Sequence, residues 1–307
     1  MKKYISTLLC LVAAMIWGFA FTAQKTSAQL DAFTVGAVRN IFATLFLLCI
    51  IPVFDKIRSK TPEYKKRESF FSKTELLGGL ICGIILTAAS AFQQTGLGDG
   101  TDAGKAAFIT ALYVVLVPII SLIFGKKTSL SVWISVVIAA VGFYLLCIKG
   151  DFTITPSDGL VLICSLIFAL HIIAIDRFSP LCDGIRMSCI QFFVGFLLNT
   201  ALALIFDMPL PWDAILTSLP SLMYLGVCSS GIAYTLQIIA QKYTNPAVAS
   251  VVLSLESVFG VVGGALFLGE TMSEREYIGC AVVFVAVILS QLDFKQIKDY
   301  LAQKRRI

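Results

Sequence analysis

Long apolar runs separated by short polar connections dominate the pattern of this chain. About 20 consecutive apolar residues allow an α-helix to cross the hydrocarbon core of a bilayer while its backbone hydrogen bonds are satisfied internally. The pattern therefore predicts an all-α integral membrane protein with ten transmembrane helices. We place these spans at 4–24, 33–53, 76–95, 103–124, 130–148, 158–176, 185–206, 215–237, 246–268 and 273–292.

The second half of the chain repeats the hydropathy pattern of the first. With a shift of 143 positions, residues 77–146 align with residues 220–289 without a gap. With a shift of 151 positions, the first two predicted spans align with the sixth and seventh. Each repeat holds five spans, and this odd number makes the second repeat enter the membrane with the opposite polarity. We therefore expect two inverted five-helix repeats, at 5–148 and 157–291.

Inverted repeats of this kind point to transport. Two halves that share a fold can exchange slightly different conformations, and the exchange opens a central site to one side of the membrane and then to the other. The alternative is an ancestral duplication that formed a static membrane scaffold.

Composition and the placement of charge agree with a membrane protein. Of the 307 residues, 58% are apolar and 14% charged, and the mean hydropathy is +0.88. A soluble domain carries about 25% charged residues, so the composition excludes a disordered, fibrous or small disulfide-rich protein and argues against a soluble enzyme. If the N-terminus is cytoplasmic, 19 of the 24 basic residues lie on the cytoplasmic side, 4 lie outside and Arg39 lies within a span.

Because cytoplasmic loops carry the excess of Lys and Arg, this distribution predicts that both termini are cytoplasmic, with a basic tail at 292–307. The net charge of +5 is then a signal of orientation, and nothing indicates nucleic-acid binding.

Motifs for metal binding and catalysis are absent from the sequence. The nine cysteines form no C-x-x-C pair, and the only histidine, His171, has no cysteine at ligand spacing. There is no H-E-x-x-H, no G-x-S-x-G and no P-loop. We therefore expect no metal, no cofactor and no enzyme activity.

Two charged residues inside the predicted spans are the leading candidates for substrate contact, because an ionisable group in a membrane is costly and normally faces a cavity or a partner. Glu256 lies near the middle of the ninth span. It either binds a cationic substrate group or a proton, or it is a structural acid hydrogen-bonded to a neighbouring helix. Arg39 lies in the second span, and it either holds a substrate carboxylate through two hydrogen bonds or extends toward the outer surface.

Three further residues could contact substrate or a cavity. Lys105 begins the fourth span near the outer surface, where substrate contact competes with a simple anchoring role. His171 lies near the cytoplasmic end of the sixth span, where proton coupling competes with a hydrogen bond to a neighbour. Trp17 lies deep in the first span rather than at the headgroup level, so it either walls a cavity or packs in the core.

The internal repeat adds three more candidates. Gln94 and Gln237 occupy equivalent places in the two halves, where they either line a polar pathway symmetrically or form hydrogen bonds at the helix ends. Tyr113 is the equivalent of Glu256 under the shift of 143 positions, which makes it a candidate cavity residue.

Four stretches of the chain resemble the EamA family of the drug/metabolite transporter superfamily. They are WGFAF in the first span, the arginine of the second span, AGKAAFITALYVVLVPIIS in the fourth and LSLESVFGVVGGALFLGE in the ninth. The resemblance covers both five-helix halves, and Arg39 and Glu256 fall on family positions. Family members commonly place a proline after that glutamate, where this chain has Ser257, and the first half ends in GKK rather than Gly-Glu.

The resemblance implies a ten-helix permease of the cell (inner or plasma) membrane, with a central cavity between the two bundles. Such proteins often export amino acids, related metabolites or drugs. We therefore expect a secondary transporter that exports a small metabolite, with a proton as the candidate coupling ion and a monomer or homodimer as the assembly. An uptake permease of the same fold and a non-transporting scaffold or sensor are the alternatives.

Overall fold

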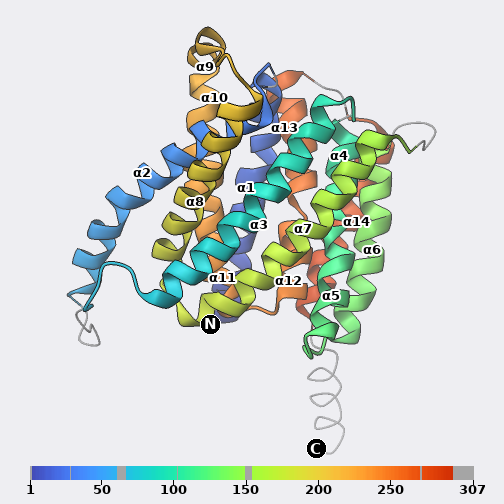
Figure 1. Ribbon diagram of the computed structural model, residues 1–307. Helices are drawn as coiled ribbons and strands as arrows, with labels where there is room; N and C mark the ends of the chain where they lie inside the picture. Colours follow the sequence, from blue (N-terminus) through green and yellow to red (C-terminus); the bar gives the residue numbers. More distant parts are fainter. Residues whose placement is uncertain are drawn as a thin grey trace, which may run out of the picture.

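The computed structural model describes residues 2–27, 29–60, 67–101, 103–148, 154–269 and 272–292. These residues form helices and connecting turns with no strand among them, so the all-α prediction is confirmed (Figure 1). The helices of the first half are α1 (Lys2–Thr26), α2 (Ala32–Arg58), α3 (Lys73–Gly98), α4 (Ala103–Ala111), α5 (Tyr113–Ile123) and α6 (Leu130–Cys147). Those of the second half are α7 (Pro156–Phe178), η1 (Ser179–Leu181), α8 (Gly184–Phe206), α9 (Trp212–Thr217), α10 (Leu219–Met223), η2 (Tyr224–Tyr234), α11 (Thr235–Gln241), α12 (Pro246–Leu253), α13 (Glu256–Leu268) and α14 (Glu274–Gln291).

Eight stretches of the described chain are long and apolar enough to cross a membrane, judged by length and composition. The other two predicted spans are also helical. One lies in α6, whose apolar stretch Leu130–Leu146 is shorter, and the other lies in α14, whose first turn carries Glu274 and Glu276. The ten-span topology with cytoplasmic termini therefore stays a prediction, and the predicted tail at 292–307 lies outside the described residues except for Leu292.

The second helices of the two halves, α2 and α8, run antiparallel along each other. At one end the backbone N–H of Thr34 donates to Asp207 Oδ2 over 2.8 Å. At the opposite end Arg58 forms an ion pair with Asp183. Because the start of α2 meets the end of α8 and the end of α2 meets the start of α8, the two helices have opposite directions.

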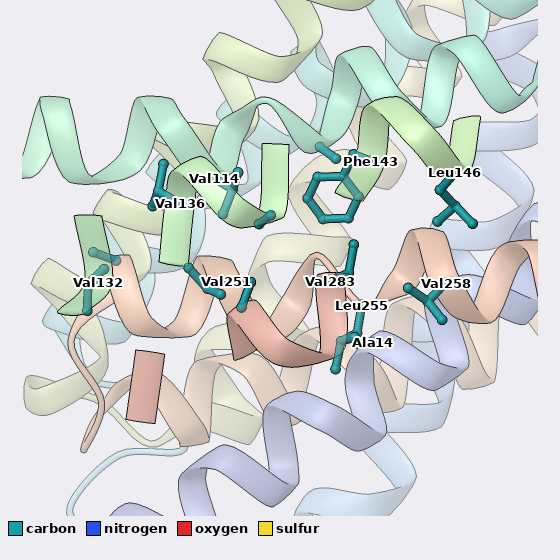
Figure 2. Packing of buried hydrophobic residues seen from close by; sticks show 14 residues of the cluster. Ala14, Val114, Val132, Val136, Phe143, Leu146, Val251, Leu255, Val258 and Val283 are labelled. Atoms are coloured by element: carbon teal, nitrogen blue, oxygen red, sulfur yellow. The ribbon is translucent and has the colours of Figure 1, made fainter. Parts of the chain in front are cut away.

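The helices that form the fifth predicted span of each half, α6 and α14, cross at two glycines. A Cβ on Gly142 would lie 2.7 Å from a methyl carbon of Val283, and a Cβ on Gly279 would lie 2.7 Å from the backbone nitrogen of Leu146. Val283 and Leu146 belong, with Phe143, to one buried apolar cluster that joins this helix pair to α1, α5, α12 and α13 (Figure 2). The absence of a side chain at Gly142 and Gly279 thus permits the close approach of the two helices.

Replacing Gly279 by valine is expected to destabilise the folded protein by about 2 kcal/mol, because overpacking a tight contact costs about 1–3 kcal/mol. The measurement is thermal unfolding of the purified protein in detergent. Gly159→Ala is the control, since its added Cβ would have no atom of another part of the chain within 4 Å. That variant should keep or slightly raise the unfolding temperature. An unchanged unfolding temperature for Gly279→Val would contradict the close crossing.

Charged side chains gather at the connection between α7 and α8, outside the candidate membrane spans. Asp183 caps α8 by accepting hydrogen bonds from the backbone N–H groups of Ile185 and Arg186 at 3.1 and 3.3 Å. Burial of the Asp183 carboxylate would by itself raise its pKa. The hydrogen bond and the charge of Arg58 outweigh that burial, and the pKa of Asp183 lies below its ordinary value.

The Asp183→Asn variant is expected to lose about 1 kcal/mol of stability at pH 7. A hydrogen bond to a charged group contributes about 1.5–3 kcal/mol, and solvent screens the Arg58 side chain, which is 42% exposed. Asparagine still caps a helix, so the variant removes chiefly the charge.

The difference in stability between the native protein and Asp183→Asn depends on pH, because the pKa of Asp183 is lowered in the folded state. A carboxyl with a depressed folded-state pKa stabilises the fold above its unfolded-state pKa, about 3.9, and loses this contribution as the pH falls through the lower folded-state value. The unfolding temperatures of the native protein and of Asp183→Asn should therefore differ at pH 7 and converge as the pH falls through the lowered folded-state pKa of Asp183. A difference that stays constant over this range would contradict the ion pair.

Two predicted spans are interrupted at equivalent places. The fourth is divided at Leu112 into α4 and α5, and the ninth is divided at Ser254 and Leu255 into α12 and α13. Leu112 and Leu255 are equivalent under the shift of 143 positions. The Ser254 hydroxyl donates to the carbonyl of Val251 over 2.7 Å, and such side-chain bonds to the preceding turn bend helices. The ninth span is thus broken although Ser257 replaces the proline common in the family that it resembles.

Candidate functional site

A cavity lies between the two halves, beside the two helix breaks. Its volume is about 60 Å³, which is room for a few water molecules. Residues from both halves line it: Trp17, Ala20, Phe21, Gln24, Arg39, Ser90, Gln93, Thr110, Tyr113, Phe168, His171, Ile172, Ser229, Tyr234, Gln237, Leu253 and Glu256. We call this space the central cavity.

The central cavity brings together residues that the internal repeat makes equivalent. Trp17 and Phe168 correspond under the shift of 151 positions, and Tyr113 and Glu256 under the shift of 143. The hydroxyl of Tyr113 donates to Glu256 Oε1 over 3.0 Å, so a residue touches its own repeat equivalent. Each of the two is the first residue of the helix that follows a break, α5 and α13 respectively. The contact therefore lies where the two halves meet.

Arg39 reaches the central cavity from α2. Its Nε donates to Ser230 Oγ over 3.0 Å, and its Nη2 donates to Ser229 Oγ over 3.3 Å. Both serines lie in η2, which winds as a π-helix, a rare form that often marks functional sites. Within the part of the chain that the structure describes, neither Arg39 nor Glu256 has an ion-pair partner. A cation and a carboxylate thus line the same cavity without being paired.

Aromatic rings form the wall next to Arg39. The ring of Trp17 lies with its centroid 4.6 Å from that of Tyr234, and its Nε1 donates to the carbonyl of Ser229 over 3.1 Å. The buried ring of His171 lies 5.8 Å from Tyr234, and its Nε2 is 3.0 Å from Gln191 Oε1. These hydrogen bonds hold Trp17 and His171 in fixed orientations at the cavity.

Known proteins resemble this chain in sequence and in fold. The model of the EamA-like transporter family matches residues 5–148 and 155–292. The chain belongs to the EamA-like transporter family. An uncharacterized transporter of Archaeoglobus fulgidus is 30% identical over 296 residues, which cover 95% of this chain and 87% of that protein. The uncharacterized inner membrane transporter YedA of Escherichia coli strain K12 is 26% identical over 225 residues, 71% of each chain.

A solved structure, described only as the crystal structure of a protein, resembles this EamA-like transporter with a TM-score of 0.74 at 15% identity. The likeness covers 93% of this chain and 96% of that chain, and it concerns the fold alone. The family membership confirms the resemblance found in the sequence and identifies the protein as a multi-pass membrane transporter of the drug/metabolite transporter superfamily.

The remaining predicted site residues of the transporter differ in where they lie. Gln237 is buried and lines the central cavity, and its Oε1 has no hydrogen-bond partner among the described residues. Gln94 does not line the cavity. Its neighbour Gln93 does, and Gln93 Nε2 donates to Thr110 Oγ1 over 3.2 Å. The side chain of Lys105 lies outside the described part of the structure.

Sequence reasoning missed several uncharged residues of the transporter's site. Tyr234 and Thr110 carried no signal, because a single polar residue in an apolar span has many ordinary roles. Ser230 had one weak signal, its small-xxx-small spacing from Gly226, which indicated close helix packing rather than a bond to Arg39. For Phe168 the sequence shows only that it is the repeat equivalent of Trp17 under the shift of 151 positions.

The chemistry of the site is that of binding. No group of three or more His, Cys, Asp or Glu side chains comes together at metal-binding distance in the described ranges. The transporter's cavity offers one guanidinium, one carboxylate, hydroxyls, amides and aromatic faces. Such a set binds a small polar molecule through charge and hydrogen bonds.

Proposed function

We propose that this transporter exports small zwitterionic metabolites, such as amino acids or related compounds, by alternating access. The observation that carries the proposal is that Arg39 and Glu256 line one cavity without a charged partner. A guanidinium binds a carboxylate through two parallel hydrogen bonds, and a carboxylate binds an ammonium group. A zwitterion compensates both charges at once, and so removes the cost of holding them within a membrane.

The proposed mechanism uses the two halves as inverted repeats, at 5–148 and 157–291, in a ten-span topology with cytoplasmic termini. The antiparallel pairing of α2 with α8 supports it, because equivalent helices of inverted repeats have opposite directions. The interrupted spans support it as well, since many transporters form their substrate site from broken helices at the repeat interface. The break at Leu112 and the break at Leu255 are the places where the halves would change shape.

Glu256 is also the proposed site of proton coupling. Its carboxylate accepts one hydrogen bond, from Tyr113, and an uncompensated charge in the membrane interior is unfavourable. A proton taken up after the substrate leaves would neutralise Glu256. A proton and a substrate ammonium group would then occupy this carboxylate in turn, which couples export to proton entry. His171 also lines the central cavity and is a further candidate for proton coupling.

Counterflow in proteoliposomes tests the proposed substrate class. Vesicles with the purified transporter are loaded with unlabelled amino acids, and the entry of a labelled amino acid is compared with that of two analogues, one without the amino group and one without the carboxyl group. We expect saturable counterflow of the amino acid and weaker counterflow of both analogues. Equal counterflow of all three would contradict binding through both charges, and an absence of counterflow for every amino acid would favour the scaffold or sensor alternative.

The direction of transport is tested in cells. Metabolites in the medium are compared between a strain that overproduces the transporter and a strain that lacks it. The proposal predicts that zwitterionic metabolites accumulate in the medium of the first strain. Accumulation inside the cells of that strain would instead identify an uptake permease of the same fold.

A further inference from the structure

A second cavity lies beside Arg39, and the proposed transport function does not use it. Its volume is about 20 Å³, and its lining comes from α2, α3, α8 and η2. Arg39, Ser90 and Tyr234 line both cavities, so these residues form the wall between them. We call the second space the side chamber.

The lining of the side chamber contains one cation and no carboxylate. Gln191 is 1% exposed, and its Oε1 lies 3.0 Å from His171 Nε2. The Nε2 of Gln191 has no hydrogen-bond partner among the described residues. The hydroxyl of Thr87, in a residue 6% exposed, also lacks a described partner. A buried donor without an acceptor is unfavourable, and an amide nitrogen can only donate. The chamber therefore favours a ligand that accepts hydrogen bonds.

The size of the side chamber limits what this ligand can be. Three glycines line it, and a Cβ on Gly195 would lie 2.6 Å from Asn40 Nδ2 while a Cβ on Gly36 would lie 2.3 Å from Asn199 Oδ1. About 20 Å³ exceeds the roughly 10–15 Å³ that one water molecule needs, but it does not admit an amino acid. A water molecule or a monatomic anion of slightly larger radius fits this space.

We propose that the side chamber binds a chloride-sized monatomic anion, which serves as the counter-ion of Arg39. The guanidinium bonds of Arg39 go to the neutral hydroxyls of Ser229 and Ser230, and a charge inside a membrane span normally pairs with an opposite charge or a polar partner. An anion accepts hydrogen bonds from Gln191 Nε2 and the Thr87 hydroxyl and also compensates the guanidinium. A water molecule satisfies the two donors but leaves the charge of Arg39 uncompensated, which is why the anion is favoured.

Because Arg39 lines both spaces, the anion in the side chamber competes with a substrate carboxylate in the central cavity for the same guanidinium. This competition rests on the proposed function, whereas binding of the anion does not. Halide binding is therefore measured without any substrate, so that its failure and the failure of the transport proposal are separate results.

The experiment is a halide titration of the purified full-length transporter in lipid nanodiscs. The unfolding temperature is followed in sodium chloride and in sodium bromide, with sodium gluconate making up a constant ionic strength because gluconate is too large for the side chamber. Saturable stabilisation by both halides is the expected result, and crystals grown with bromide should show one anomalous peak beside Arg39. Equal stability in gluconate, or a water molecule in place of the bromide peak, would overturn the proposal.

Three variants localise the effect to the side chamber. Thr87→Val removes one hydroxyl with little change of shape and should weaken halide binding about tenfold, since it deletes a hydrogen bond to a charge. Gln191→Glu keeps the acceptor that faces His171, supplies a fixed negative charge next to Arg39, and should abolish the halide effect. Thr200→Val is the matched control, because the Thr200 hydroxyl is also buried without a described partner but does not line the chamber. Loss of the halide effect in Thr200→Val, or its persistence in both other variants, would contradict the site.

Discussion

Replacing Glu256 by glutamine is expected to reduce counterflow of an amino acid by about 10- to 100-fold. Glutamine has nearly the same shape and keeps an acceptor for the Tyr113 hydroxyl, which lies 3.0 Å from Glu256 Oε1. The variant therefore removes mainly the negative charge that faces the central cavity. A hydrogen bond to a charged group contributes about 1.5–3 kcal/mol, and every 1.4 kcal/mol is about a factor of ten in affinity.

The matched control for this variant is Tyr113→Phe. It deletes the hydrogen bond to Glu256 but leaves the carboxylate in place, so counterflow should fall much less than in Glu256→Gln. The analogue without an amino group gives a second control, because its low counterflow should be unaffected by Glu256→Gln. Full amino acid counterflow in Glu256→Gln would show that Glu256 is a structural acid.

Replacing Arg39 by glutamine is expected to reduce amino acid counterflow by a similar factor of about 10 to 100. Arg39 brings the cation of the central cavity, and its bonds to Ser229 and Ser230 hold the guanidinium in place. Arg39→Lys keeps the charge but lacks the planar fork that binds a carboxylate through two hydrogen bonds, so its loss should be intermediate. Transport of an amine without a carboxyl group should be largely retained in both variants.

The control for Arg39 is an arginine elsewhere in the bundle. Arg275 lies with its guanidinium carbon 5.2 Å from the ring centre of Tyr144, away from the central cavity, and Arg275→Gln should transport normally. Substrate selectivity decides between the two interpretations of Arg39. Equal losses for the amino acid and for the amine would indicate that Arg39 stabilises the fold rather than binds the carboxylate.

The helices and their order could be predicted from the sequence because lipid imposes a simple rule on length and polarity. A spanning helix must be apolar over about 20 residues, and this signal is strong where the whole helix contacts lipid. It is weaker for α6, whose apolar stretch Leu130–Leu146 is shorter, and for α14, whose first turn carries two acidic residues. The break in the ninth span could not be predicted, because the Ser254 hydroxyl bends the helix in place of a proline.

The candidate site was predicted best where a residue is rare in its surroundings. Arg39 and Glu256 stood out because ionisable groups in apolar spans are few, and both line the central cavity. The internal repeat singled out Tyr113, which lines the cavity, and Gln94, which does not line it although its neighbour Gln93 does. Successive residues on a helix point about 100° apart, so these two neighbours face different sides of α3.

The part of the site on η2 could not be predicted from the sequence. Sequence periodicity assumes the 3.6-residue turn of an α-helix, whereas a π-helix bonds each residue to the fifth along the chain and turns different residues toward one face. Ser229 and Tyr234 face the central cavity from this π-helical stretch. Their positions follow from a local geometry that the hydrophobic pattern does not encode.

The contact between Tyr113 and Glu256 has a consequence for the resting transporter. Two identical halves would exchange conformations between states of equal free energy, and the empty protein would face each side of the membrane half of the time. Here a phenol and a carboxylate hold equivalent positions, and among the described residues the π-helical stretch η2 stands where the first half has the regular helix α3. A difference of about 1.4 kcal/mol between the two states already gives a tenfold preference for one orientation. Under the proposed mechanism, this asymmetry would give the two states unequal free energies, and the empty transporter would rest mainly open to one side of the membrane.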